Sequence, residues 1–143
     1  MLPNFSAEEL RCQGSGELRL ARGFAPALQG LRDALTLDYA RDGMHPEEAE
    51  AAAVMIVNSA CRSPAHNTDV GGAEESLHLT RGGLVDGCAA VDVRADREDD
   101  DEYRERLIAV ARERGWSVGY HSSFLHLDAR AWYGHDRVEF DYG

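Results

Sequence analysis

Apolar residues recur at helical spacing in two segments of the chain. Between residues 24 and 39, and again between residues 101 and 114, they lie three or four positions apart with polar side chains between them. This period is typical of an amphipathic helix that buries one face. The pattern therefore predicts two long helices, 24–39 and 101–114. The acidic run at 98–102 favours the start of the second, because negative charge there complements the helix dipole.

Shorter apolar segments predict the strands. Apolar and polar positions alternate in 89–93, 116–120 and 124–128, as in half-buried strands, and the last two are close enough in sequence to form a hairpin. The apolar run 54–57, which follows a short alanine-rich helix, predicts a further, buried strand. Glycine and proline are frequent between residues 59 and 87, so we expect a long loop with about one turn of helix, and such loops often have a function.

The predicted elements form a single domain of the α+β class over residues 1–143. A chain of 143 residues has the usual size of one domain. We expect a small, mainly antiparallel sheet with both long helices packed on one face. The alternation places Asp92 opposite the apolar face of its strand, and it places Phe124, His126 and Asp128 together on one face of another strand. We expect the polar side chains on the sheet face that the helices leave open.

Composition and charge restrict the classes of partner. The chain has 26 acidic and 15 basic residues, a formal net charge of −11, which argues against nucleic acid as a partner. No segment approaches the roughly 20 apolar residues of a membrane-spanning helix, so we expect no membrane insertion. The N-terminal sequence lacks a secretory signal pattern, so we expect a cytoplasmic protein as synthesised. Cys12, Cys61 and Cys88 lie far apart and predict free thiols, and nothing in the pattern selects an oligomeric state.

Three residues could bind a metal ion. His78 and His126 lie in the segments SLHL and FLHLD, and Asp92 lies on the polar side of the strand AVDV. Two histidines and a carboxylate are a ligand set of catalytic zinc sites, in which a fourth position stays open for water. Spacing alone is a weak indication, because a single histidine on a strand more often has a structural role.

An ordered set of motifs resembles one family. The segments are NFSAEELRC, LQGLRDAL, NSACRSPAHN, VGGAEESLHL, AAVDV and FLHLDAR, and the likeness extends over residues 4–132. In this order they resemble the zinc D-alanyl-D-alanine carboxypeptidases, and within them a small murein-peptidase branch common in phages and prophages. The resemblance implies a hedgehog-like peptidase fold and a Zn²⁺ ion bound by His78, Asp92 and His126. It also implies that Arg62, in the SxxRSP motif, holds a carboxylate or carbonyl oxygen of the substrate, as a guanidinium does well.

The sequence departs from the family pattern in two places. The family's histidine and aspartate ligands are seven positions apart, whereas His78 and Asp92 are 14 apart, with an insert that contains Asp86. Asp86 is thus an alternative ligand, but the strand context favours Asp92. Several branches also have a Glu or Asp three residues before the last zinc histidine, and Ser123 occupies that position here.

Because serine alone is a poor general base, the proton of the attacking water must go to another group. His121, in the turn before the last predicted strand, is our candidate base, since histidine side chains titrate near neutral pH. An exposed turn residue without a catalytic role is an equal alternative for His121. We expect Asp128, on the face of His126, to orient that ring, as carboxylates often do for metal-binding histidines.

The resemblance implies zinc-dependent hydrolysis of an amide bond in the stem peptide of peptidoglycan, by a carboxypeptidase or endopeptidase. A phage or prophage endolysin that acts on the cell wall after release fits the expected location. The alternative is a non-catalytic, zinc-stabilised binding or virion structural domain of the same fold, and the serine at position 123 favours it.

Overall fold

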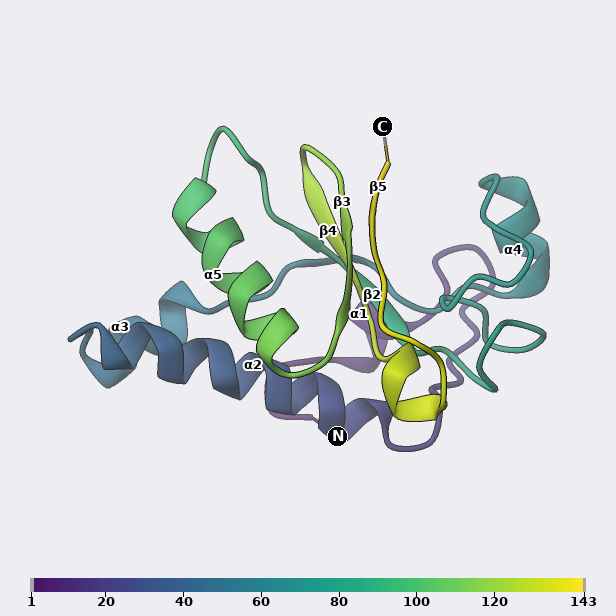
Figure 1. Cartoon of the computed structure of the whole chain (residues 1–143). Coiled ribbons are helices and arrows are strands. Elements are labelled where there is room, and N and C mark those ends of the chain that lie inside the picture. The colour runs from purple at the N-terminus through teal and green to yellow at the C-terminus, as the bar shows by residue number, and fades with distance from the viewer. Residues whose placement is uncertain (1, 143) are drawn as a thin grey trace.

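A five-stranded sheet lies at the centre of the protein, which we describe over residues 2–142 of a computed structural model (Figure 1). The order is β1-β2-β4-β3-β5, and all neighbours are antiparallel except β3 and β5, which are parallel. This confirms the predicted α+β class. The strands are β1 (Val57–Ser59), β2 (Ala90–Arg94), β3 (Ser117–Tyr120), β4 (Phe124–Asp128) and β5 (Glu139–Asp141).

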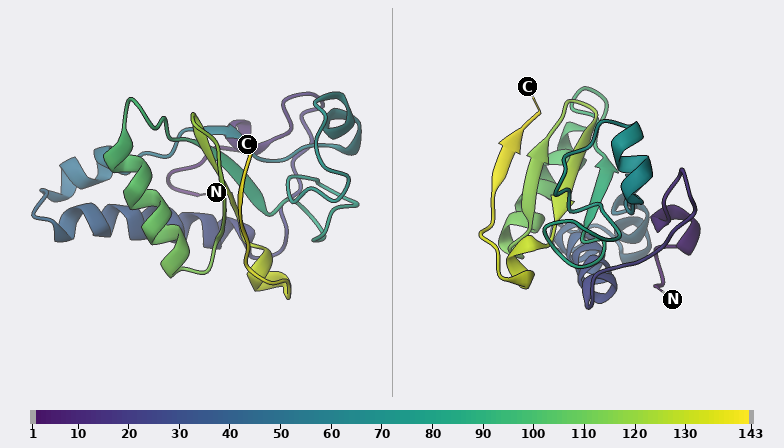
Figure 2. Two further views of the ribbon diagram at one scale, coloured as in Figure 1. Left: turned by 45° about the horizontal axis from the view of Figure 1, so that its top comes forward. Right: turned by 90° about the vertical axis from the view of Figure 1, so that its right-hand side faces the viewer.

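The helices lie on both sides of this sheet. Figures 1 and 2 show α2 and α5 on one side of it, and α4 with its flanking loops on the other. The two predicted long helices are thus confirmed, with small shifts at their ends. The helices are α1 (Ala7–Leu10), α2 (Phe24–Arg41), α3 (Pro46–Ala52), α4 (Pro64–Asp69) and α5 (Asp101–Glu113), with a 3₁₀ helix, η1 (Arg130–Tyr133). Over residues 2–142, no helix has the length and apolar character needed to cross a membrane.

The sheet register separates an apolar face from a polar one. Asp92 in β2 pairs with His126 in β4, and His126 pairs in turn with Gly119 in β3. Cross-strand partners point to the same face, so Asp92 and His126 lie side by side. The residues that alternate with them, including Val91 and Leu127, are fully buried in the core. The alternation along the two strands therefore predicts correctly that Asp92 and His126 lie on the same, polar face.

The predicted buried strand at 54–57 is wrong. The strand begins only at Val57 and lies at one edge of the sheet, and the preceding side chains alternate between core and solvent. Val54 and Ile56 are 50% and 52% exposed, whereas Met55 is buried at 4%. At a sheet edge only one side meets the core, so an apolar run there need not be buried on both sides.

The long loop is largely as predicted. Between β1 and β2 the chain forms one short helix, α4, whose first turn is capped by the Ser63 side chain and begins with Pro64. The three cysteines are free and buried, as expected. We did not predict α1, η1 or β5, all of which have only three or four residues.

Candidate metal centre

Three side chains from separate parts of the chain converge on the sheet face opposite α2 and α5. His78 comes from the loop after α4, Asp92 from β2 and His126 from β4. His78 Nε2 and His126 Nδ1 each lie 3.1 Å from Asp92 Oδ1, and the two nitrogens are 3.3 Å apart. All three residues are buried, at 3%, 7% and 5% exposure. The three candidate ligands thus form one tight cluster.

The other ring nitrogens fix the tautomers of the two histidines. His78 Nδ1 lies 2.6 Å from the Ala60 carbonyl oxygen, which can only accept, so Nδ1 has the proton. His126 Nε2 lies 2.7 Å from Asp128 Oδ2 and donates to that carboxylate. In these neutral forms, His78 Nε2 and His126 Nδ1 both present lone pairs toward Asp92 Oδ1.

This arrangement fits a metal ion. Two lone pairs and a carboxylate oxygen that face one another, largely out of water, repel unless a cation lies between them. Ligand atoms about 2.0 Å from a tetrahedral zinc are about 3.3 Å from each other, close to the three separations in the cluster. His78, Asp92 and His126 could therefore hold such an ion.

The electrostatics of the cluster follow from burial and from its partners. Burial lowers the pKa of His78 and keeps its ring neutral. Burial acts the same way on His126, but the carboxylates of Asp128 and Asp92 beside the ring outweigh burial and raise its pKa. Burial would raise the pKa of Asp92, yet the two histidine rings beside its carboxylate lower it far below the usual range. Asp92 is therefore ionised at neutral pH, as a metal ligand must be.

Asp128 lies behind His126 and is fully buried. It accepts from Arg130 through the backbone N–H at 3.1 Å, Nε at 2.9 Å and Nη2 at 2.8 Å, besides the bond from His126. Burial opposes ionisation of Asp128, but these donors lower its pKa far below normal. Its oxygens thus face Arg130 and His126.

Arg62 lies on the loop side of the cluster. Its Nη2 is 3.5 Å from Asp92 Oδ2, and its Nη1 is 3.4 Å from Asn67 Oδ1, both long for hydrogen bonds. Asn67 is in turn anchored by a 2.8 Å bond from Nδ2 to the Ala73 carbonyl. The guanidinium is thus oriented toward the cluster but only weakly held.

A cavity of about 620 Å³ opens above the cluster. Its lining includes the three candidate ligands, Arg62 and Arg130, and the loop at 70–77. Phe124, Phe140 and Tyr142 line it from the side of the sheet. Sequence reasoning missed Arg130, Phe140 and Tyr142 as site residues. Arg130 could have been found in the segment FLHLDAR, whereas β5, which contains Phe140 and flanks Tyr142, is too short to give a signal.

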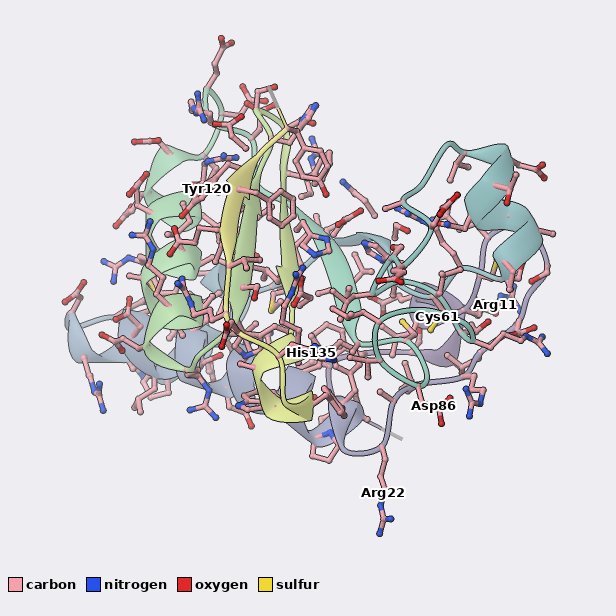
Figure 3. The ribbon with its side chains drawn as sticks, turned by 45° about the vertical axis from the view of Figure 1, so that its right-hand side comes forward. Arg11, Arg22, Cys61, Asp86, Tyr120 and His135 are labelled. Atoms are coloured by element: carbon pink, nitrogen blue, oxygen red, sulfur yellow. The ribbon has the colours of Figure 1, made fainter. Side chains whose placement is uncertain are left out.

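The structure separates the two aspartates that compete as ligands. Asp86 forms an ion pair with Arg19 at 2.7 Å, and its side chain is 84% exposed. Figure 3 shows it on an outer loop that points away from the sheet. Asp92, not Asp86, therefore joins the two histidines.

His121 lies at the edge of the site. Its ring stacks on Phe124 with centroids 4.5 Å apart, and it is not among the residues that line the cavity. Its Nδ1 accepts a 3.1 Å hydrogen bond from the Ser123 backbone N–H and lies 3.0 Å from Ser123 Oγ. Phe124 thus lies beside His121 at the mouth of the cavity. Ser123 itself contacts His121.

The chain matches a known protein family over most of its length. A profile described as Peptidase M15 matches residues 4–128, which include every candidate ligand and Arg62. No curated protein gives a significant match to the chain. The helix η1 and strand β5 lie beyond the matched residues.

Proposed function

The chain belongs to the peptidase M15 family, and from this premise we propose that it is a zinc-dependent peptidase that hydrolyses an amide bond in the stem peptide of peptidoglycan. The observation that supports this most directly is the cluster of two histidine lone pairs and a carboxylate oxygen on the wall of a 620 Å³ cavity. A cavity of this size accommodates a short peptide segment. The lytic, endolysin-like role implied by the resemblance belongs to the same proposal.

His78, Asp92 and His126 would hold the zinc ion. Zinc in a site with three protein ligands acts as a Lewis acid on a carbonyl oxygen and lowers the pKa of water to about 7. The protein side chains would orient the ligands, bind the substrate and transfer protons. Asp128, with its oxygens engaged by Arg130 and His126, keeps the His126 ring oriented so that Nδ1 faces Asp92.

Arg62 would bind the substrate. Its present bonds to Asp92 and Asn67 are long, so exchanging them for a carboxylate or a carbonyl oxygen of a peptide costs little. A guanidinium binds a carboxylate with two parallel hydrogen bonds and also stabilises negative charge that develops on a carbonyl oxygen.

His121 would be the general base. A neutral ring that accepts at Nδ1 has its proton on Nε2, so His121 must leave the bond with the Ser123 N–H before it can accept a proton from water. The ring is about half-buried at the mouth of the cavity and lies against Phe124, one of the lining residues. A substrate in the cavity would therefore come close to it.

The proposal is tested by digestion of purified peptidoglycan. The wild-type protein is incubated with the sacculi in the presence of zinc or of a chelator, and His126→Ala is the matched control. Mass spectrometry of the soluble fragments then identifies new amino and carboxyl termini. We expect new termini only with the wild type and zinc. If no stem-peptide bond is cut under any condition, the proposal is wrong and the non-catalytic domain takes its place.

A further inference from the structure

The wall of the cavity formed by the C-terminal segment has no assigned role. β5 lies beside β3, with Gly119 opposite Phe140 and Tyr120 opposite Asp141. Phe140 lines the cavity from this strand and Tyr142 from just after it, although both lie outside the residues matched to the family. Both residues therefore come from the part of the chain that follows the matched residues.

The sheet holds this segment in a defined place. The Tyr142 backbone N–H donates a 3.0 Å hydrogen bond to the Tyr120 carbonyl. A side chain at Gly119 would put its Cβ only 2.5 Å from the Phe140 ring, so the glycine makes room for that ring over His126. At the start of the strand, Glu139 accepts hydrogen bonds from Arg112 and Tyr120. The segment is thus fixed at both ends.

The Tyr142 ring packs among other aromatic rings at the mouth of the cavity. Its centroid lies 5.5 Å from Phe124, 5.4 Å from Phe140 and 6.1 Å from His121. The residue is nevertheless 49% exposed. Within residues 2–142 its hydroxyl has no hydrogen-bond partner, so it is free to bind a ligand.

The charges that act on the phenol are those of the candidate metal centre. Partial burial raises the pKa of Tyr142 to about 12, with Asp92 and Asp128 adding to the effect and Arg62 opposing it. The hydroxyl thus keeps its proton at any pH at which a peptidase of this kind would work, so it can donate a hydrogen bond but cannot act as a base.

Resting on the proposed function, we propose that Tyr142 is a catalytic residue, whose hydroxyl donates a hydrogen bond to the carbonyl oxygen of the amide bond that is cut. The oxygen gains negative charge as water adds to the carbonyl carbon, and a fixed donor stabilises that charge. Arg130 also lines the cavity, but three of its donor groups are engaged by Asp128. Tyr142 is therefore a neutral donor on the cavity wall whose hydroxyl is available, and Arg62 is a charged one.

The test compares two variants that each lose one tyrosine hydroxyl. Tyr142→Phe removes the free hydroxyl and keeps the ring in its aromatic packing. Tyr133→Phe is the matched control, because its hydroxyl donates to the Arg22 carbonyl and the residue does not line this cavity. Zinc content and the thermal unfolding midpoint are measured first. We expect the zinc content to be unchanged in both variants, and the midpoint to be unchanged in Tyr142→Phe and at most slightly lower in Tyr133→Phe, which loses one hydrogen bond.

Two further measurements test the role itself. For Tyr142→Phe we expect kcat on peptidoglycan fragments to fall about 10- to 100-fold with little change in KM, as for the loss of one donor to a developing oxyanion. A phosphinate analogue of the cleaved bond, whose tetrahedral oxygens imitate the transition state, should bind about 10-fold more weakly or worse. Tyr133→Phe should match the wild type in both.

The outcomes separate this inference from the proposed function. If the wild type cuts peptidoglycan and Tyr142→Phe keeps the wild-type kcat and phosphinate affinity, Tyr142 has no catalytic role, although the proposed function stands. A rise in KM with unchanged kcat would also overturn it, because it would mean binding alone. If the wild type cuts no stem-peptide bond, both proposals fail.

Discussion

The two walls of the cavity are built in different ways. The sheet wall consists of β2 and β4, and it presents Asp92 and His126 from paired strands with fixed register. The loop wall consists of residues 62–84 and presents Arg62 and His78. The candidate ligands are thus divided two to one between a regular sheet and a glycine-rich loop. The cluster is complete only while the loop lies against the sheet.

The loop wall is held mainly by bonds to its own neighbours. The Arg62 N–H donates to the His78 carbonyl at 2.8 Å, and the Thr80 N–H donates to the Arg62 carbonyl at 2.9 Å. The His78 ring donates to the Ala60 carbonyl. These bonds fix His78 relative to Arg62, whereas strand pairing fixes Asp92 relative to His126. An ion in the cluster would connect the two walls directly.

Loss of a ligand from either wall should have the largest effect. We expect His78→Ala, Asp92→Ala and His126→Ala each to reduce bound zinc from about one ion per chain to nearly none, because a three-ligand site rarely tolerates the loss of one ligand. Metal analysis of the purified proteins measures this. Asp86→Ala, in the exposed ion pair with Arg19, is the control and should keep its zinc. A full zinc content in His78→Ala would mean that the loop wall supplies no ligand.

The next largest effect should come from Arg62 on the loop wall. We expect Arg62→Ala to lower hydrolysis about 10²-fold or more with zinc content unchanged, because it removes a donor that stabilises developing charge. Arg62→Lys should restore little, since an ammonium lacks the planar fork of a guanidinium. The kcat and KM of both variants on the same peptide measure this. Normal turnover in both would reduce Arg62 to a structural partner of Asp92.

His121 and Asp128 belong to the sheet side, and their proposed roles differ. We expect His121→Ala to lose most of its activity together with the acidic limb of the pH–rate profile, because the base is gone. Asp128→Asn should hold the His126 ring less firmly and so lower the activity. The activity that remains should still show the acidic limb of the pH–rate profile. Profiles of kcat against pH for both variants measure the difference. Wild-type rates in His121→Ala, with zinc-loaded Asp128→Asn inactive, would reverse the two assignments.

Gly72 in the loop wall and Gly119 in β3, next to the sheet wall, each permit a close contact. In Gly72→Ala the new Cβ would lie 2.0 Å from Asn67 Oδ1, and in Gly119→Ala it would lie 2.5 Å from the Phe140 ring. We expect each to reduce the free energy of unfolding by about 1–3 kcal/mol, because packed side chains must move. Urea unfolding measures this loss. Gly72→Ala should also lower peptidase activity, because its new Cβ would lie 3.2 Å from Arg62 Nη1 and would displace the guanidinium.

Gly30→Ala is the matched control for these variants. It lies in α2, and the nearest atom to its new Cβ is the end of the Arg114 side chain. We expect it to be neutral or slightly stabilising, since alanine favours a helix interior. If Gly72→Ala and Gly119→Ala are as stable as this control, the close contacts of Gly72 with Asn67 and of Gly119 with Phe140 do not contribute to stability.

The smallest expected effect is a change in the free energy of unfolding at low pH. Hydrogen bonds from Arg112, Tyr120 and Arg137 lower the pKa of Glu139 to about 2, below the value of about 4.3 in an unfolded chain. The resulting stabilisation of β5 is fully present above pH 4.3 and is lost as the pH falls toward 2. Urea unfolding of the wild type and Glu139→Gln between pH 2 and 6 measures it. Their difference should shrink toward pH 2 and remain small, because Glu139 is an exposed residue whose side chain is still 28% accessible to water.

The sheet wall could be predicted from the sequence, and the loop wall only in part. A period of two residues placed Asp92 and His126 on one face, because strand geometry is regular. The position of His78 depends on turns and on the contact of Arg62 with its neighbours, which no periodicity encodes. Its likeness to a family motif was the only guide. β5 has three residues, two of them acidic, and its pairing with β3 is a tertiary contact.

The sequence separations of the ligands have a consequence for folding. They lie 14 and 34 residues apart, so an ion bound to all three would act as a non-covalent cross-link that closes two loops of the chain. The unfolded chain rarely brings such distant groups together, and it would bind the ion far more weakly. The folded protein would then gain stability with free zinc concentration, about 2.7 kcal/mol at 100 times the dissociation constant. The melting temperature would in that case report the metal content of the surroundings as much as the packing of the core.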